Sequence, residues 1–210
     1  GSHQILERFD LFGSGEIGSK VLNEPAVRAY LDKEHQGLKP LQIYTHQPGQ
    51  IHTAKTPVRK AEDLKGLRIR FASPVVRDFI AELGGTPVGI PSPEIVENMQ
   101  KGTLDGAFID YGGAGVAFKL GGTVKYSTEM YSYVTSFGLA ANPDWFGKLP
   151  ADLRKLIDDS VKGVEKEVGV GWDALDDIGK KLLVDGGAQP IKLSAAEDAR
   201  FRKTAAQVTE

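Results

Sequence analysis

The centre of the chain alternates β-prone runs with helical segments, and this alternation restricts the fold more than any other feature of the sequence. Strands are expected at 67–71, 87–90 and 104–109, and helices at 73–83 and 92–101. Each of these helices is followed by glycine, the residue that most readily adopts the left-handed conformation that ends a helix. The succession predicts an α/β sheet with helices packed against it.

Weaker patterns flank this centre. Between 17 and 35 apolar residues recur at helical spacing around Pro25, which predicts one or two helices. Short β-prone runs follow at 41–45 and 50–54, with a turn signal, Pro48-Gly49, between them.

The last third of the chain combines strand and helix patterns. The segment 126–141 is rich in β-branched and aromatic residues and predicts long strands, whereas 150–183 predicts a long helix that is interrupted near Gly169 and Gly171. A strand is expected at 189–193, then a helix whose capping box is Ser194 and Glu197.

Composition excludes several classes of function. The 26 basic and 28 acidic residues form no long run of one sign, so we expect no nucleic-acid partner. The absence of cysteine excludes disulfides, thiolate metal sites and a cysteine nucleophile, and it fits an oxidising compartment. The histidines lack metal-ligand spacing, and Phe118 stands where a dinucleotide-binding loop needs glycine after Gly113 and Gly115. We therefore expect no cofactor and no metal.

Five sequence segments together resemble one known family. They read AEDLKGLRIR at 61–70, LGGTPV at 83–88, PEIV at 93–96, GTLDG at 102–106 and NPDWFGKLP at 142–150. In this order and spacing they resemble the DctP-type solute-binding receptors of tripartite ATP-independent periplasmic (TRAP) transporters. The resemblance covers roughly residues 35–159 well and the remainder more loosely.

The resemblance implies a periplasmic-binding-protein-like (type II) fold, in which two α/β lobes and a long bridging helix close around a ligand. Family members begin with a βαβ portion that would precede Gln4, so we expect the fold here to be incomplete. The expected division is a tag remnant at 1–3, part of the first lobe with crossing segments at 4–66, the second lobe at 67–135, and returning strands, the long helix and the C-terminal segment at 136–210.

The function implied is that of a periplasmic receptor that captures a small organic acid for the membrane subunits of a TRAP transporter. The alternative is an α/β enzyme with Arg70 as substrate anchor and Asp110 or His52 as acid or base. An incomplete first lobe would leave strand edges unpaired, so we also expect a dimer or an exchanged assembly with weak ligand binding.

The family pattern assigns the ligand's carboxylate to Arg70, whose planar guanidinium offers two parallel N–H donors. Arg68 is interpreted as a solvated surface charge. Gln50 and His52 fall where relatives place a second polar contact, although a histidine beside a turn is equally a plain surface residue.

An apolar wall is expected after the Asp105-Gly106 motif, where sialic-acid-type receptors carry Gln-Glu-Asn and this chain carries apolar residues. Ordinary sheet core is the alternative reading of these aromatic residues, and for Phe108 it is the favoured one. Asp110 has three possible roles: to orient Arg70, to contact a ligand hydroxyl or to cap a helix. The candidates for the wall are Phe108, Tyr111 and, across the cleft, Tyr131 or Phe137.

Overall fold

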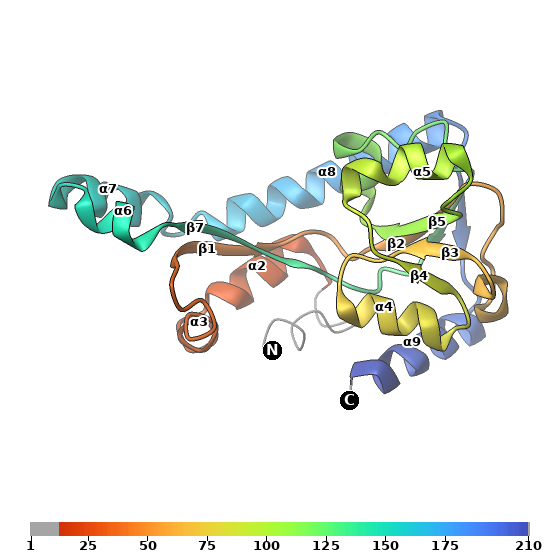
Figure 1. Ribbon diagram of the computed structural model, residues 1–210, viewed down its shortest axis with the longest axis horizontal. Helices are drawn as coiled ribbons and strands as arrows, with labels where there is room; N and C mark the ends of the chain where they lie inside the picture. The colour runs from red at the N-terminus through yellow and green to blue at the C-terminus, as the bar shows by residue number, and fades with distance from the viewer. Residues whose placement is uncertain (1–12, 210) are drawn as a thin grey trace.

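The computed structural model describes residues 13–209, so the expected tag remnant and the region of Gln4 lie outside the described residues. A six-stranded sheet has the order β4-β3-β5-β2-β6-β8, and β1 and β7 form a separate two-stranded ribbon that extends from it (Figure 1). The strands are β1 Lys39–Thr45, β2 Gln50–Thr53, β3 Arg68–Arg70, β4 Thr86–Val88, β5 Gly106–Ile109, β6 Tyr126–Glu129, β7 Ser136–Ala141 and β8 Gln189–Lys192. The helices are α2 Gly15–Asn23, α3 Pro25–Leu31, η1 Ala61–Leu64, α4 Pro74–Glu82, η2 Ser92–Glu94, α5 Ile95–Lys101, η3 Gly113–Ala117, α6 Pro143–Lys148, α7 Ala151–Ser160, α8 Glu165–Asp185 and α9 Ala195–Thr209.

The predicted α/β alternation is confirmed. Strand β3 pairs in parallel with both β4 and β5, and helices α4 and α5 occupy the two connections between these strands. Side chains of β5 alternate between the two faces of the sheet, as the period of a strand requires. Phe108 packs with Phe79 of α4 and Phe201 of α9 on one face, whereas Ala107 and Ile109 belong to the cluster on the other.

The ribbon and α8 connect the sheet to the rest of the molecule. Strands β1 and β7 pair antiparallel from Lys39↔Ala141 to Thr45↔Ser136. In Figure 1 the long helix α8 runs beside this ribbon and reaches the sheet. Asp173 of α8 accepts hydrogen bonds from the backbone N–H groups of Gly15, at 2.7 Å, and Glu16, at 3.2 Å, and so fixes the start of α2 against α8.

The predicted interruption near Gly169 and Gly171 is wrong. The helical stretch breaks at 161–164 instead, where Gly163 has a φ of +75°, and both glycines lie inside the continuous helix α8. Gly169 is needed for close packing, since a Cβ there would lie 2.4 Å from the Cα of Glu16. Gly169 therefore marks a close contact between α8 and α2 and not the end of a helix.

Other predictions hold in part. Pro25 does separate two helices, because it begins α3 immediately after α2. The region 126–141 divides into β6, which joins the six-stranded sheet, and β7, which joins the ribbon. Ser194 accepts the N–H of Glu197 at 3.2 Å, but the Glu197 side chain accepts from the N–H of Ala61 at 3.1 Å instead of closing a capping box.

The six-stranded sheet draws on all three of the sequence ranges expected for the lobes. Strand β2 comes from 4–66, strands β3, β4, β5 and β6 come from 67–135, and β8 comes from 136–210. Within the described part of the chain, none of the helices is both long and apolar enough to cross a membrane.

Candidate functional site

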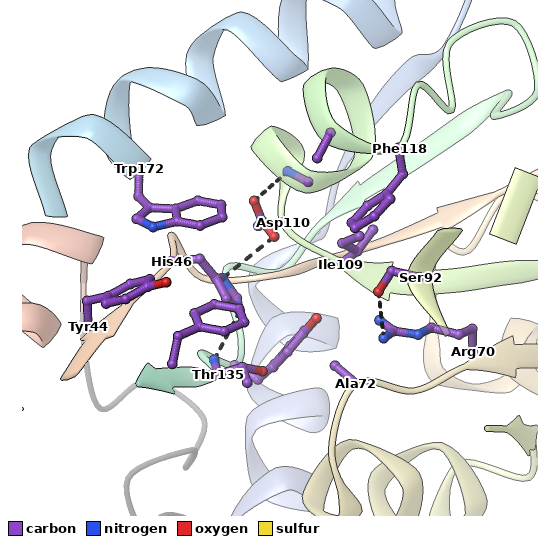
Figure 2. A pocket seen from close by; sticks show the side chains of 14 residues that line it. Tyr44, His46, Arg70, Ala72, Ser92, Ile109, Asp110, Phe118, Thr135 and Trp172 are labelled. Carbon is purple, nitrogen blue, oxygen red and sulfur yellow. Dashed lines mark hydrogen bonds and ion pairs between the residues drawn. The ribbon is translucent and has the colours of Figure 1, made fainter. Parts of the chain in front are cut away.

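A cavity of about 290 Å³ lies where β3 and β5 end beside the ribbon and α8. In α/β sheets, ligands bind outside the carboxyl ends of the strands, which is where Arg70 ends β3 and Asp110 follows β5. Figure 2 shows these two side chains at different parts of the wall, with the aromatic residues between and around them. The lining residues are Tyr44, His46, Arg70, Ala72, Ser92, Ile109, Asp110, Gly113, Ala117, Phe118, Tyr133, Thr135, Phe137 and Trp172.

Arg70 is a partly buried cation whose hydrogen bonds all go to neutral oxygens. Its guanidinium donates to the carbonyl of Ile90 at 3.3 Å, to the carbonyl of Phe108 at 3.2 Å and to the hydroxyl of Ser92 at 2.9 Å. Burial lowers the pKa of Arg70 from its ordinary value, although a guanidinium remains charged at any ordinary pH. No carboxylate within residues 13–209 lies at ion-pair distance from it, although the charge of Asp110 favours the charged form of Arg70 from farther away.

Asp110 is the acidic member of the lining, and its side chain is only 8% exposed. One oxygen, Oδ2, accepts the N–H of Gly113 at 2.7 Å. Glycine at position 113 leaves room for this carboxyl group, because a Cβ there would lie 2.8 Å from the other oxygen, Oδ1, and would force a shift. The Nδ1 of His46 lies 3.8 Å from Oδ1, which is beyond hydrogen-bond distance.

The bonding partners of His46 fix where its proton lies. Its Nε2 accepts the backbone N–H of Thr135 at 3.0 Å and therefore carries no proton of its own. The remaining ring proton is on Nδ1, which donates to the carbonyl of Gln47. The ring donor of His46 is therefore directed to the backbone rather than to Asp110.

Aromatic rings form much of the remaining wall. Phe137 of β7 stacks on Trp172 of α8 with ring centres 5.8 Å apart and planes at 6°. Tyr44 stacks on the Phe137 ring with centres 5.5 Å apart, and the His46 ring lies 5.6 Å from that of Tyr133. A wall of this kind favours a ligand with an aromatic or apolar body.

A second buried carboxyl group, Asp176 of α8, lies beside this site without lining the cavity. It accepts the N–H of Gly112 at 3.2 Å. Burial, together with the nearby charge of Asp110, raises the pKa of Asp176 to about 7. Helix α8 is therefore joined to the loop after β5 by a group whose charge changes near neutral pH.

Three of the predicted ligand contacts, Arg70, Asp110 and Phe137, are brought together in this cavity. Gln50 is not among its lining residues. It is fully buried, and its Oε1 accepts the N–H groups of Met130, at 2.7 Å, and Tyr131, at 3.0 Å. Gln50 thereby fixes the segment that connects β6 to β7.

His52 also lies away from the cavity, inside the sheet. Its ring nitrogens contact the hydroxyl of Ser127 at 2.8 Å and the carbonyl of Ile109 at 3.2 Å. Burial lowers the pKa of His52 to about 4, so the ring is neutral at ordinary pH. The alternative reading of His52 as a surface residue is wrong, because its side chain is fully buried.

Phe108, Tyr111 and Tyr131 are likewise absent from the lining. Phe108 is fully buried in sheet core, the reading favoured for it, and its ring lies 5.8 Å from that of Tyr133, which does line the cavity. Tyr111 is buried and donates its hydroxyl to Glu129 at 3.2 Å. Arg68, interpreted as a solvated surface charge, has a side chain that is 40% exposed and pairs with Asp105 at 2.8 Å, outside the cavity.

Sequence reasoning missed several lining residues, notably Tyr44, His46, Phe118 and Trp172. Tyr44 and His46 lie at the end of a predicted strand, and Trp172 lies in the predicted long helix. The sequence therefore predicted these elements but not the direction in which the three side chains point. Only the packing of α8 beside the ribbon brings Trp172 to Phe137. Within residues 13–209, no cluster of acidic or histidine side chains suited to a metal ion is found.

Comparison with known proteins gives a family match and similar structures. The family model DctP, described as bacterial extracellular solute-binding protein, family 7, matches residues 11–210. The ectoine-binding periplasmic protein TeaA of Halomonas elongata is 25% identical over 217 residues, covering 98% of this chain and 58% of that protein. The chain thus spans less than two thirds of this curated relative's length.

Two solved structures are similar in fold and share more than 25% sequence identity with this chain. A marine metagenome TRAP solute-binding protein specific for aromatic acid ligands, in complex with metahydroxyphenylacetate, has a TM-score of 0.90 and 26% identity and is matched over 98% of this chain and 66% of its own. A TRAP solute-binding protein from Rhodoferax ferrireducens, in complex with copurified benzoate, has a TM-score of 0.84 and 26% identity, with 98% and 65% covered.

Proposed function

The chain belongs to the bacterial extracellular solute-binding proteins of family 7, and we propose that it serves as a receptor for a small aromatic carboxylate. The observation that carries this proposal is Arg70, a partly buried cation that bonds only to neutral oxygens at the edge of an aromatic cavity. A buried charge is costly unless it is paired. An anionic ligand would supply the missing partner.

The carboxylate of the ligand is assigned to the guanidinium of Arg70, where it would accept two parallel N–H bonds. Ser92 and the carbonyls of Ile90 and Phe108 already hold this guanidinium in one orientation. Such preorganisation lowers the entropy that binding costs. Arg70 would then fix the carboxylate end of the ligand, and the rest of the cavity would determine which groups are accepted at the other end.

The body of the ligand is assigned to the aromatic wall formed by Tyr44, Phe118, Tyr133, Phe137 and Trp172. A cavity of about 290 Å³ is just below the range of roughly 300–1,000 Å³ typical of small-molecule sites, which favours a ligand with a single ring. The similar structures described above hold metahydroxyphenylacetate and benzoate, which supports an aromatic acid here.

The enzyme alternative finds little support in the site. It assigned the acid or base role to Asp110 or His52, but both ring nitrogens of His52 are engaged inside the sheet. Asp110 lines the cavity, but the neighbouring His46 already bonds to backbone groups through both ring nitrogens, and the neighbouring Asp176 does not line the cavity. We therefore propose capture without chemical change.

We further propose that the protein works in the periplasm and delivers its ligand to the membrane subunits of a TRAP transporter. The family match and the fold shared with periplasmic receptors support this setting.

A ligand panel tests the proposal. The full-length protein is screened by thermal shift against benzoate, phenylacetate, mandelate, succinate and a sugar acid, and every bound compound is recovered and identified by mass spectrometry. We expect the aromatic monocarboxylates to stabilise the protein most and to be recovered unchanged. Conversion of a recovered compound would favour the enzyme, and a stronger shift with the sugar acid would contradict the aromatic assignment.

A further inference from the structure

We propose that Asp110 determines specificity, by selecting aromatic acids that carry a hydroxyl group away from the carboxylate and by rejecting dicarboxylates. This inference rests on the proposed function, because it presupposes that Arg70 holds the ligand's carboxylate. It extends that function to the other end of the ligand.

The first step is that Oδ1 of Asp110 has no hydrogen-bond donor from the described residues. Its companion Oδ2 is bonded to Gly113, and the proton on Nδ1 of His46 is directed to the carbonyl of Gln47. Yet the side chain is only 8% exposed and lines the cavity. A carboxylate oxygen that lines a cavity and accepts no other hydrogen bond can accept one from a ligand O–H.

The second step is the placement of the two charges. In the parallel pair of β3 and β5, Arg70 lies opposite Ala107, so Asp110 is three residues farther along its strand direction. That offset is roughly 10 Å along the sheet. Figure 2 shows the cation and the carboxylate separated on the wall, with the aromatic side chains nearby. A ligand ring lying between them would present its carboxylate to one and its substituent to the other.

The third step is what Asp110 excludes. A second carboxylate on the ligand would meet a negative charge in a poorly solvated, aromatic setting, where like charges repel more strongly than in water. Specificity gained by an unfavourable contact with the wrong ligand is as effective as specificity gained by a favourable contact with the right one. Asp110 would do both with a single side chain.

The test uses ligands that differ only in the distal group: benzoate, the 3- and 4-hydroxybenzoates, the matching methylbenzoates and benzene-1,3-dicarboxylate. We expect calorimetry on the full-length protein to show one hydroxybenzoate binding at least tenfold more tightly than its methyl counterpart. The dicarboxylate should bind at least tenfold more weakly than benzoate.

The variant Asp110→Asn keeps the shape of the side chain and an oxygen for Gly113. It should relieve the penalty on the dicarboxylate, relative to benzoate, at least tenfold and reduce the preference for hydroxyl over methyl. Asp176→Asn, at the neighbouring buried carboxyl outside the lining, is the matched control and should keep both preferences.

The outcomes separate this inference from the proposed function. If benzoate binds but the hydroxyl and methyl ligands bind equally, or if Asp110→Asn keeps the wild-type preferences, the role of Asp110 is overturned and the receptor stands. If none of the aromatic acids binds, the proposed function itself fails. The wild-type comparison alone is decisive if the variant does not fold.

Discussion

Replacement of Asp176 by asparagine should make the protein more stable at pH 8 and should remove a pH dependence from its unfolding. Asp176 is 7% exposed and lies beside Asp110, and burial together with the Asp110 charge raises its pKa from the ordinary value of 3.8 to about 7. The native state therefore binds this proton more tightly than the unfolded state does. Stability consequently falls as pH rises from the unfolded value towards about 7, and the loss remains in full above that pH.

The size of the effect follows from the two pKa values. A difference of about three units, at about 1.4 kcal/mol each, sets an upper figure of about 4 kcal/mol, and coupling to Asp110 makes about 2–4 kcal/mol the working range. Asparagine is neutral throughout and retains an oxygen for the N–H of Gly112, which Asp176 accepts at 3.2 Å. Its stability advantage over the wild type should therefore grow by about this amount between pH 4 and pH 8.

Urea denaturation at pH 4, 6 and 8 measures this difference, since carboxyl groups far from Asp176 titrate alike in both proteins and cancel. Asp177→Asn is the matched control, because Asp177 is the adjacent, exposed residue of the same helix. A stability difference for Asp176→Asn that is the same at all three pH values, or one no larger than that of the control, would refute the reasoning.

Three further predictions concern packing and assembly. Gln50→Ala should lower the free energy of unfolding by about 2 kcal/mol or more in a urea titration, because it leaves the N–H groups of Met130 and Tyr131 without their acceptor. Gln100→Ala, at an exposed glutamine, is the control and should lower it by less than about 0.5 kcal/mol. Gly179→Ala should lower the free energy of unfolding by about 2 kcal/mol or more, because its Cβ would lie 2.0 Å from the carbonyl oxygen of Tyr111. Gly171→Ala, in the same helix but with open space around it, should be neutral or stabilise by up to about 1 kcal/mol. Equal shifts of the melting temperature in the two variants would contradict this. The two-stranded ribbon carries exposed Leu139 and no further ladder partner within residues 13–209, so light scattering on the 210-residue chain should show a dimer or larger species, and a monodisperse monomer would count against it.

The sequence predicted local structure well where turn residues and periodicity act within a short window. The strands and helices between 67 and 109 follow from glycine ends and apolar spacing, and the split at Pro25 follows from the geometry of proline. The break at Gly163 was missed, because Gly169 and Gly171 looked like better helix breakers. In the structure Gly169 packs closely against α2 and Gly171 faces open space, and both lie inside a continuous helix.

The cavity was less predictable than the fold, for a physical reason. Arg70 was found because the family resemblance assigns the ligand's carboxylate to it, and Asp110 because it closes the segment after the Asp105-Gly106 motif. The rings of Trp172 and Phe137 are brought together only when α8 packs beside the ribbon, and no pattern within either segment specifies that contact. Gln50 and His52 were placed correctly on a strand, but the direction of their side chains depended on which strands became its neighbours.

The central claim is that Arg70 anchors a carboxylate, and isothermal titration of Arg70→Lys in the full-length protein with its best aromatic acid tests it most directly. Lysine keeps the charge but replaces the bidentate fork by a single ammonium, so binding should weaken by roughly 2 kcal/mol or more, which is about thirtyfold. Arg68→Lys, two residues away and paired with Asp105 outside the cavity, should bind as the wild type does. Wild-type affinity in Arg70→Lys would contradict the account.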